Sequence, residues 1–280
     1  MIRVFARVAF VLAIALTAVR HEAAAARELV TFEGTFAQGG LVVGRTDPGT
    51  IVEFEGRPVR VSPDGVFVIG FGRDAPPKAR LKLRYPDGLE EVQELEVAQR
   101  DYDIQRLDGL PKKMVTPPPE TWERIKADNR KIGKVRKIDT DETWFLSGWI
   151  WPADGPISGV YGSQRILNGK PKQPHYGVDV AAPAGTPVVA PADGTVVLAE
   201  TDMYYTGGTI FLDHGHGLES AFLHMSKVDV KVGQFVHRGE RIGAVGATGR
   251  VTGAHLDWRI NLFGIRIDPE FLVPPRREKD

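Results

Sequence analysis

The sequence of 280 residues contains no cysteine. Disulfide bonds and thiolate zinc ligands are therefore excluded, and a bound metal would have to take its ligands from histidine, aspartate or glutamate. The chain also has no excess of charge, because its 36 basic residues are matched by 36 acidic ones. It lacks the clustered Lys and Arg that mark a nucleic-acid-binding surface, so we expect no nucleic-acid partner.

Long apolar runs are also missing. The longest, Val8–Val19, is too short for the roughly 20 residues that a membrane span needs. It follows Arg3 and Arg7 and precedes the small residues Ala23–Ala26, the order found in a cleaved export signal. The sequence therefore predicts a signal peptide over residues 1–26 and no membrane association after cleavage. We expect an exported protein, with the periplasm preferred over the extracellular space.

Glycine and proline are plentiful, with 31 and 20 copies, as expected for many short strands joined by turns. Residues 27–98 alternate apolar and polar side chains between turn signals such as Asp47-Pro48-Gly49 and Pro86-Asp87-Gly88. This pattern predicts a small β-sandwich-like N-terminal module. It holds no histidine, and we interpret it as a spacer or targeting module.

The remaining chain divides into a linker and a second β-rich part. Residues 99–149 are predicted to form a linker with one helix, which begins after Pro117–Pro119 and carries apolar residues near helical spacing at Trp122, Ile125, Ile132 and Val135. Residues 150–276 return to short strands with glycine-marked turns and predict a compact all-β domain. The fold class is therefore mainly β.

Six of the seven histidines lie between positions 175 and 255. On a strand, His175 and Asp179 would share one face, with Gly177 leaving space between them. His255 and Asp257 would share a face in the same way, and His224 ends a third apolar stretch. Each motif alone could be a structural histidine or a surface pair, but together they predict one site.

The order and flanking residues of these motifs resemble the lysostaphin/LytM-type zinc metallopeptidases over roughly residues 150–273. The matching segments are His175–Asp179 with Ala181-Ala182-Pro183, then Leu223-His224-Met225-Ser226, Thr248-Gly249-Arg250 and Gly253-Ala254-His255. The resemblance implies a LytM-type peptidase domain that binds one zinc ion through His175 and Asp179. It also implies that His224 and His255 flank the metal-bound water as the catalytic pair. The implied activity is hydrolysis of peptide crosslinks in bacterial peptidoglycan, the expected partner.

One position departs from the family pattern. The third zinc ligand of the family is a histidine, and here that position is Asp257. Aspartate is an accepted zinc ligand, so our hypothesis is that Asp257 completes the site. Two carboxylates and one neutral imidazole would cancel the charge of the ion and weaken its activation of water. Arg165 is a further candidate for substrate contact, and His214 and His216 are expected to organise a turn near the site.

Two alternatives belong to other functional classes. A catalytically degenerate member of the family would bind the cell wall or activate another cell-wall hydrolase. A lipoyl- or biotinyl-like carrier would explain the Val-x-x-Gly rhythm near residues 230–245, but no lysine stands in the context that such a carrier modifies. A regulatory protein partner also stays open.

Overall fold

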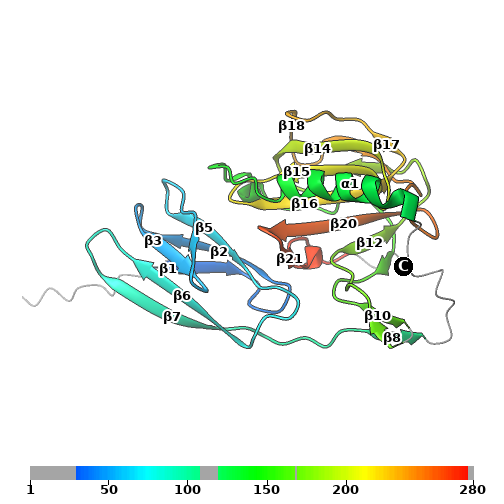
Figure 1. The fold of residues 1–280 in the computed structure, drawn as a ribbon. Helices are drawn as coiled ribbons and strands as arrows, with labels where there is room; N and C mark the ends of the chain where they lie inside the picture. Colours follow the sequence, from blue (N-terminus) through cyan, green and yellow to red (C-terminus); the bar gives the residue numbers. More distant parts are fainter. Residues whose placement is uncertain (1–29, 108–118, 168, 277–280) are drawn as a thin grey trace, which may run out of the picture.

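The computed structural model describes residues 30–107, 119–167 and 169–276 (Figure 1). Within them the chain is mainly β with a single α-helix, which confirms the predicted fold class. The predicted signal peptide at residues 1–26 lies outside the described residues. None of the described helices is long and apolar enough to cross a membrane.

The N-terminal part consists of two small antiparallel sheets that share one buried core. One sheet has the order β1-β2-β5, formed by Val30–Gly34, Leu41–Thr46 and Val66–Gly70. The other has the order β4-β3-β6-β7, formed by Arg57–Val59, Ile51–Phe54, Lys78–Arg84 and Glu90–Glu96. Alternating residues from both sheets, among them Val42, Phe67 and Leu81, fill the core between them.

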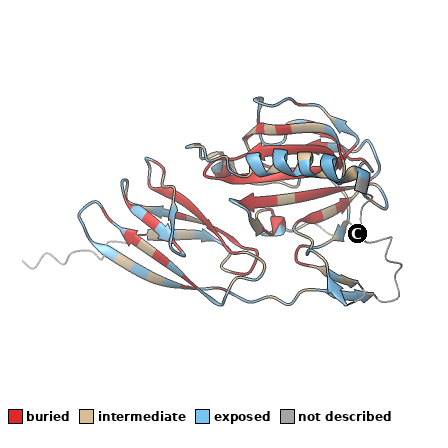
Figure 2. Cartoon of the chain, viewed as in Figure 1, coloured by how far each residue is buried: buried red, intermediate tan, exposed pale blue. Residues whose placement is uncertain are grey.

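The C-terminal part is built on a larger sheet of the order β18-β14-β15-β16-β20-β12-β9, with β21 paired to β20. These strands are Phe235–Val236, Gly194–Met203, Gly207–Asp213, Leu218–Met225, His255–Leu262, Val178–Ala181, Ile157–Gly159 and Ile265–Ile267. Strands β15, β16 and β20 are buried along most of their length (Figure 2). A second small sheet, β13-β19-β17, comprises Pro187–Val189, Arg241–Ala244 and Lys227–Val228.

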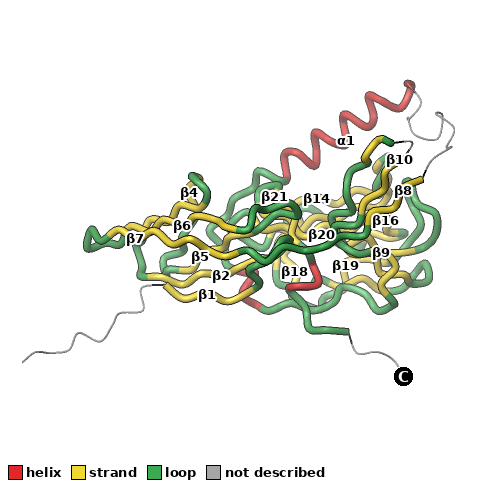
Figure 3. Tube along the Cα trace, turned by 90° about the horizontal axis from the view of Figure 1, so that it is seen from below, coloured by secondary structure: helices red, strands yellow, loops and turns green. Residues whose placement is uncertain are grey.

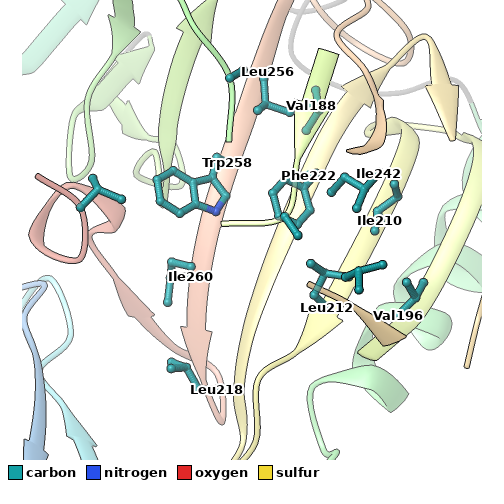
Figure 4. Packing of buried hydrophobic residues seen from close by; sticks show 14 of the residues in the cluster. Val188, Val196, Ile210, Leu212, Leu218, Phe222, Ile242, Leu256, Trp258 and Ile260 are labelled. Carbon is teal, nitrogen blue, oxygen red and sulfur yellow. The ribbon is translucent and has the colours of Figure 1, made fainter. Parts of the chain in front are cut away.

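The main core lies on one face of the large sheet. There Trp258 and Phe222, both fully buried, pack with aliphatic residues of neighbouring strands (Figure 4). Because side chains alternate along a strand, the residues between these core positions point to the opposite face. On β20 the residues of that opposite face are His255, Asp257, Arg259 and Asn261. The sheet therefore presents a polar row along β20.

Helix α1, Trp122–Val135, lies over β14 and β15 on this opposite face (Figure 1). It follows a short 3-10 turn at Pro119–Thr121, and its buried end packs Val135 against Leu198 and Phe211. Trp122 at the other end is 49% exposed, so the predicted apolar stripe is buried only toward the C-terminal end of the helix. Two further 3-10 turns are Trp144–Ser147 and Pro269–Phe271.

The linker supplies a strand as well as the predicted helix. Strand β8, Ile104–Leu107, pairs in parallel with β10, Gln164–Leu167, which forms a hairpin with β11, Lys170–Pro171. These strands lie together at one end of the molecule, away from β1–β7 (Figure 3). The predicted boundaries at residues 98 and 149 stay a prediction.

Candidate metal centre

Strands β12 and β20 are antiparallel and set Asp179 directly opposite Asp257. His175 lies just before β12, and its Nε2 atom is 3.1 Å from Asp179 Oδ1 and 3.8 Å from Asp257 Oδ2. One ligand atom from each of the three residues lies within 4.8 Å of the other two. The structure therefore brings together the three side chains that the sequence predicts as metal ligands.

Two atoms of this group lack a hydrogen-bond partner. His175 Nε2 and Asp179 Oδ1 are buried, and within the described part of the chain neither makes a hydrogen bond. Such orphaned polar atoms are rare in folded proteins and call for an unseen water or ion. The donor set, one imidazole nitrogen and carboxylate oxygens, is one that zinc accepts. These residues therefore fit a divalent cation.

Two glycines keep the site open. A Cβ atom built on Gly159 would overlap Asp179 Oδ2, and one on Gly177 would lie 2.9 Å from Asp257 Oδ1. A larger residue at position 159 would displace the Asp179 carboxylate, and one at position 177 would first meet the Trp258 carbonyl oxygen and the Arg259 side chain. Gly177 was expected from the sequence to leave this space, whereas Gly159 on the neighbouring strand β9 was not recognised.

A backbone contact sets the orientation of the His175 ring. Its Nδ1 atom lies 3.2 Å from the Val160 carbonyl oxygen, which can only accept a hydrogen bond. Nδ1 therefore carries a proton, and Nε2 faces the two carboxylates. Burial lowers the pKa of His175, but the nearby carboxylates of Asp179 and Asp257 outweigh it and raise that pKa to about 10. A metal would replace the proton held at Nε2.

The two predicted catalytic histidines lie beside each other at the same site. The ring centroids of His224 and His255 are 4.9 Å apart, and His255 Nε2 is 3.8 Å from Asp179 Oδ1. Each ring has its Nδ1 atom 2.9 Å from a backbone carbonyl, that of Thr248 for His224 and that of Gly253 for His255. Because a carbonyl only accepts, Nδ1 carries the proton in the neutral form of either ring, and Nε2 is then the unprotonated nitrogen.

His224 is held in an uncommon backbone conformation. Its φ of 65° is left-handed, which non-glycine residues rarely adopt and which is concentrated at functional sites. The His224 amide donates to the Thr206 carbonyl at 2.8 Å, and the Thr248 hydroxyl donates to the Met225 carbonyl at 2.8 Å. Burial lowers the pKa of His224, so the ring is neutral near pH 7 and can accept a proton.

Arg259 is the main residue that the sequence interpretation missed. Its Nε atom lies 2.8 Å from Asp257 Oδ1 and its Nη2 atom 2.5 Å from Asp257 Oδ2, which makes a two-pronged ion pair. Burial raises the pKa of Asp257, but the Arg259 guanidinium and His175 hold it well below its usual range. Strand alternation could have found this residue, because positions 257 and 259 share a face.

Comparisons with known proteins agree with this geometry. Residues 173–269 match peptidase family M23. The peptidoglycan DD-endopeptidase ShyA of Vibrio cholerae is 46% identical over 91 residues, 32% of this chain and 21% of that protein. The cell division protein DipM of Caulobacter vibrioides is 31% identical over 169 residues, 57% of this chain and 26% of that protein. The chain thus spans about a fifth to a quarter of the length of these curated relatives.

The similarity to one solved structure extends over most of the chain. The crystal structure of a protein of Pseudomonas aeruginosa, described as a peptidase M23, is 32% identical, covers 85% of this chain and 95% of its own, and superposes with a TM-score of 0.65. The chain belongs to peptidase family M23. The resemblance to LytM-type peptidases, drawn from the histidine motifs, is therefore confirmed.

Arg165 is not one of the grouped ligand residues of this M23 peptidase. It is exposed on β10, in the hairpin that leads to His175. The His175 amide donates to the Ser163 carbonyl at 2.8 Å, which fastens the base of that hairpin beside the site. A contact between Arg165 and substrate stays a prediction.

The expectation that His214 and His216 lie near the M23 site was wrong. They lie in the turn before β16, whereas His224 lies near the other end of that strand. At about 3.3 Å per residue, the strand separates them from the site by roughly 20 Å. The buried His214 ring donates from Nδ1 to the Asp193 carbonyl at 2.6 Å and accepts at Nε2 from the Ser220 hydroxyl at 2.7 Å. Its role is structural.

Proposed function

We propose that this M23 protein is an exported zinc metalloendopeptidase that hydrolyses peptide crosslinks of bacterial peptidoglycan. In this proposal His175, Asp179 and Asp257 bind one zinc ion. The observation that carries it is that one ligand atom from each of the three residues lies within 4.8 Å of the others, and that His175 Nε2 and Asp179 Oδ1 are buried without a hydrogen bond. The name of the Vibrio cholerae relative, a peptidoglycan DD-endopeptidase, supports the substrate class.

A bound zinc ion would supply Lewis acidity, which polarises a scissile carbonyl and makes a neighbouring water more acidic. The protein's own contribution to the proton transfers comes from His224 and His255, whose Nε2 atoms are free to accept and donate protons. One of them takes a proton from the attacking water at its unprotonated Nε2, whereas the other must enter the reaction as imidazolium, with a proton on Nε2 that it gives to the leaving amine nitrogen. Thr248 and Gly253 hold the two rings in the tautomer that this exchange requires.

The proposed location is the periplasm. Peptidoglycan lies outside the cytoplasm, and residues 1–26 have the order of an export signal. In the chain's described residues, no helix offers a membrane anchor. Export of the full chain, followed by N-terminal sequencing of the mature protein, tests this part: a start near Arg27 is expected.

A second candidate is a non-catalytic M23 module that binds the cell wall or activates another hydrolase. The specific observation in its favour is the ion pair between Asp257 and Arg259, which engages both carboxylate oxygens without a metal. A carboxylate already neutralised in this way would be a poorer metal ligand. This candidate predicts wall binding without cleavage.

Digestion of purified peptidoglycan by the mature protein tests the proposal. We expect new amino groups and shortened crosslinks by mass spectrometry, loss of both with a chelator, and recovery with zinc. Metal analysis should give one zinc ion per chain, and Asp257→Ala should lose it. Binding to peptidoglycan with no cleavage under several divalent metals would replace the enzyme with the non-catalytic module.

A further inference from the structure

The ion pair between Asp257 and Arg259 is built into the strand that carries the site. Both residues lie on the same face of β20, two positions apart. The guanidinium meets both carboxylate oxygens, at 2.8 Å and 2.5 Å. The Asp257 side chain is 4% exposed and that of Arg259 27% exposed, so little solvent screens the pair.

The sum of charges around the ligand group indicates what the positive charge of Arg259 contributes. Asp179 and Asp257 contribute two negative charges to the site, which a divalent ion with a neutral His175 would cancel to zero. A site without net charge stabilises a developing oxyanion poorly. The fixed charge of Arg259 raises the sum to plus one, because arginine stays protonated in proteins.

We propose that Arg259 is a positioning residue of the metal site that holds Asp257 in place and gives the loaded site its net positive charge. This inference rests on the proposed function, since it requires that the site binds a divalent metal. The two hydrogen bonds from the Arg259 guanidinium fix the plane of the Asp257 carboxylate. Each carboxylate oxygen retains a second lone pair that can bind the ion.

The same positive charge repels the metal. Two unit charges 4 Å apart interact by about 1 kcal/mol even in bulk water, and the interaction doubles for a divalent ion and grows in a partly buried site. Removal of the Arg259 charge should therefore strengthen metal binding. A residue that served only the fold would give the opposite result, because damage to a ligand's support weakens binding.

Zinc affinity, measured by competition with a chromophoric chelator, tests the inference on the full mature chain. We expect Arg259→Gln, which keeps a donor for Asp257 but no charge, to bind zinc ~10-fold more tightly than the unmodified chain, or better. Arg259→Lys keeps the charge and should stay within about threefold of the unmodified chain. Arg259→Met is a second neutral variant with the same expectation, and circular dichroism checks that each variant folds.

Arg266→Gln is the matched control. It removes an equal charge from the neighbouring strand β21, where the guanidinium pairs with Asn261 instead of a ligand. We expect a smaller change in zinc affinity than for Arg259→Gln. Unchanged or weaker zinc binding by both neutral variants, with the unmodified chain binding normally, overturns this inference alone. Failure of the unmodified chain to bind zinc overturns it together with the proposed function.

Cobalt(II) provides a second readout for the positioning role. The visible absorption of bound cobalt depends on the geometry of its ligands. We expect Arg259→Lys, which loses the fork and retains the charge, to shift this spectrum while its zinc affinity stays near that of the unmodified chain. A spectrum identical to that of the unmodified chain would remove the positioning part of the inference.

Discussion

Asp179 and Asp257 are direct partners across β12 and β20, so two carboxylates meet on one face of the sheet. Like charges in directly opposed positions destabilise a sheet, and a divalent ion between them would relieve the repulsion. We expect zinc at about 100 times its dissociation constant to raise the free energy of unfolding by about 3 kcal/mol. Calorimetry with zinc and with a chelator measures this. An equal zinc effect in Asp179→Asn would contradict the assignment.

Replacement of His224 or His255 should strongly reduce catalysis without loss of the bound metal. For His224→Ala and His255→Ala we expect peptidoglycan cleavage to fall by ~10²–10⁴-fold, the usual contribution of general acid–base groups. Zinc content should stay at that of the unmodified chain, because neither residue is among the proposed ligands. Loss of zinc along with activity would instead make that histidine a ligand.

Gly159 offers a test from outside the ligand set. A methyl group there would overlap Asp179 Oδ2, so we expect Gly159→Ala to lower zinc affinity by ~100-fold, equivalent to about 3 kcal/mol. The fold should persist, since Gly159 is not among the positive-φ glycines. Gly72→Ala, whose new methyl would meet its nearest neighbour at 3.8 Å, is the control. Equal zinc affinity in both variants would show that Asp179 has room to move.

The lowered pKa of His214 predicts that the free energy of unfolding changes with pH. Burial lowers its pKa to about 4 from the ordinary value of 6.5. The unfolded chain therefore takes up the proton first, so the stability associated with neutral His214 is complete above pH 6.5 and is lost as pH falls toward 4. The loss should be on the order of 3 kcal/mol.

Comparison with a variant isolates this contribution. Burial raises the pKa of Glu219 to about 7, which acts on stability in the opposite sense over part of the same range. Because Glu219 is present in both proteins, the difference in unfolding free energy between the unmodified chain and His214→Asn cancels it. Urea titrations at several pH values should show that difference shrinking toward pH 4. Parallel curves would mean that His214 keeps an ordinary pKa.

The ligand group was predictable because strand alternation and motif spacing set it. Asp179 and Asp257 each carry a partner histidine within four residues, and antiparallel pairing was enough to bring the two motifs together. Asp257 and Arg259 are also close in sequence. A single sequence, however, does not tell whether the Arg259 side chain pairs with Asp257 or extends into solvent. The distance of His214 from the site depends on the length of β16. Motif spacing in the sequence does not predict that length.

The fold was predictable at the level of element type and less so in its long-range pairing. Turn signals and alternation indicated the strands around Val66–Gly70 and Lys78–Arg84, and helical spacing indicated α1. Nothing local indicated that Ile104–Leu107 would become a strand, because its partner β10 lies about sixty residues further along the chain. Such pairing is decided by tertiary contacts.

Strand β8 covers one edge of β10, next to His175. The surroundings of the proposed metal site therefore depend on a segment that precedes the C-terminal part. A fragment cut at residue 150 would keep the proposed ligands but leave the β10 backbone with an open, unpaired edge beside His175. Open edges recruit foreign strands, so such a fragment would self-associate at the β10 edge beside His175. Assays on a fragment trimmed at residue 150 would therefore understate the activity proposed for the whole chain.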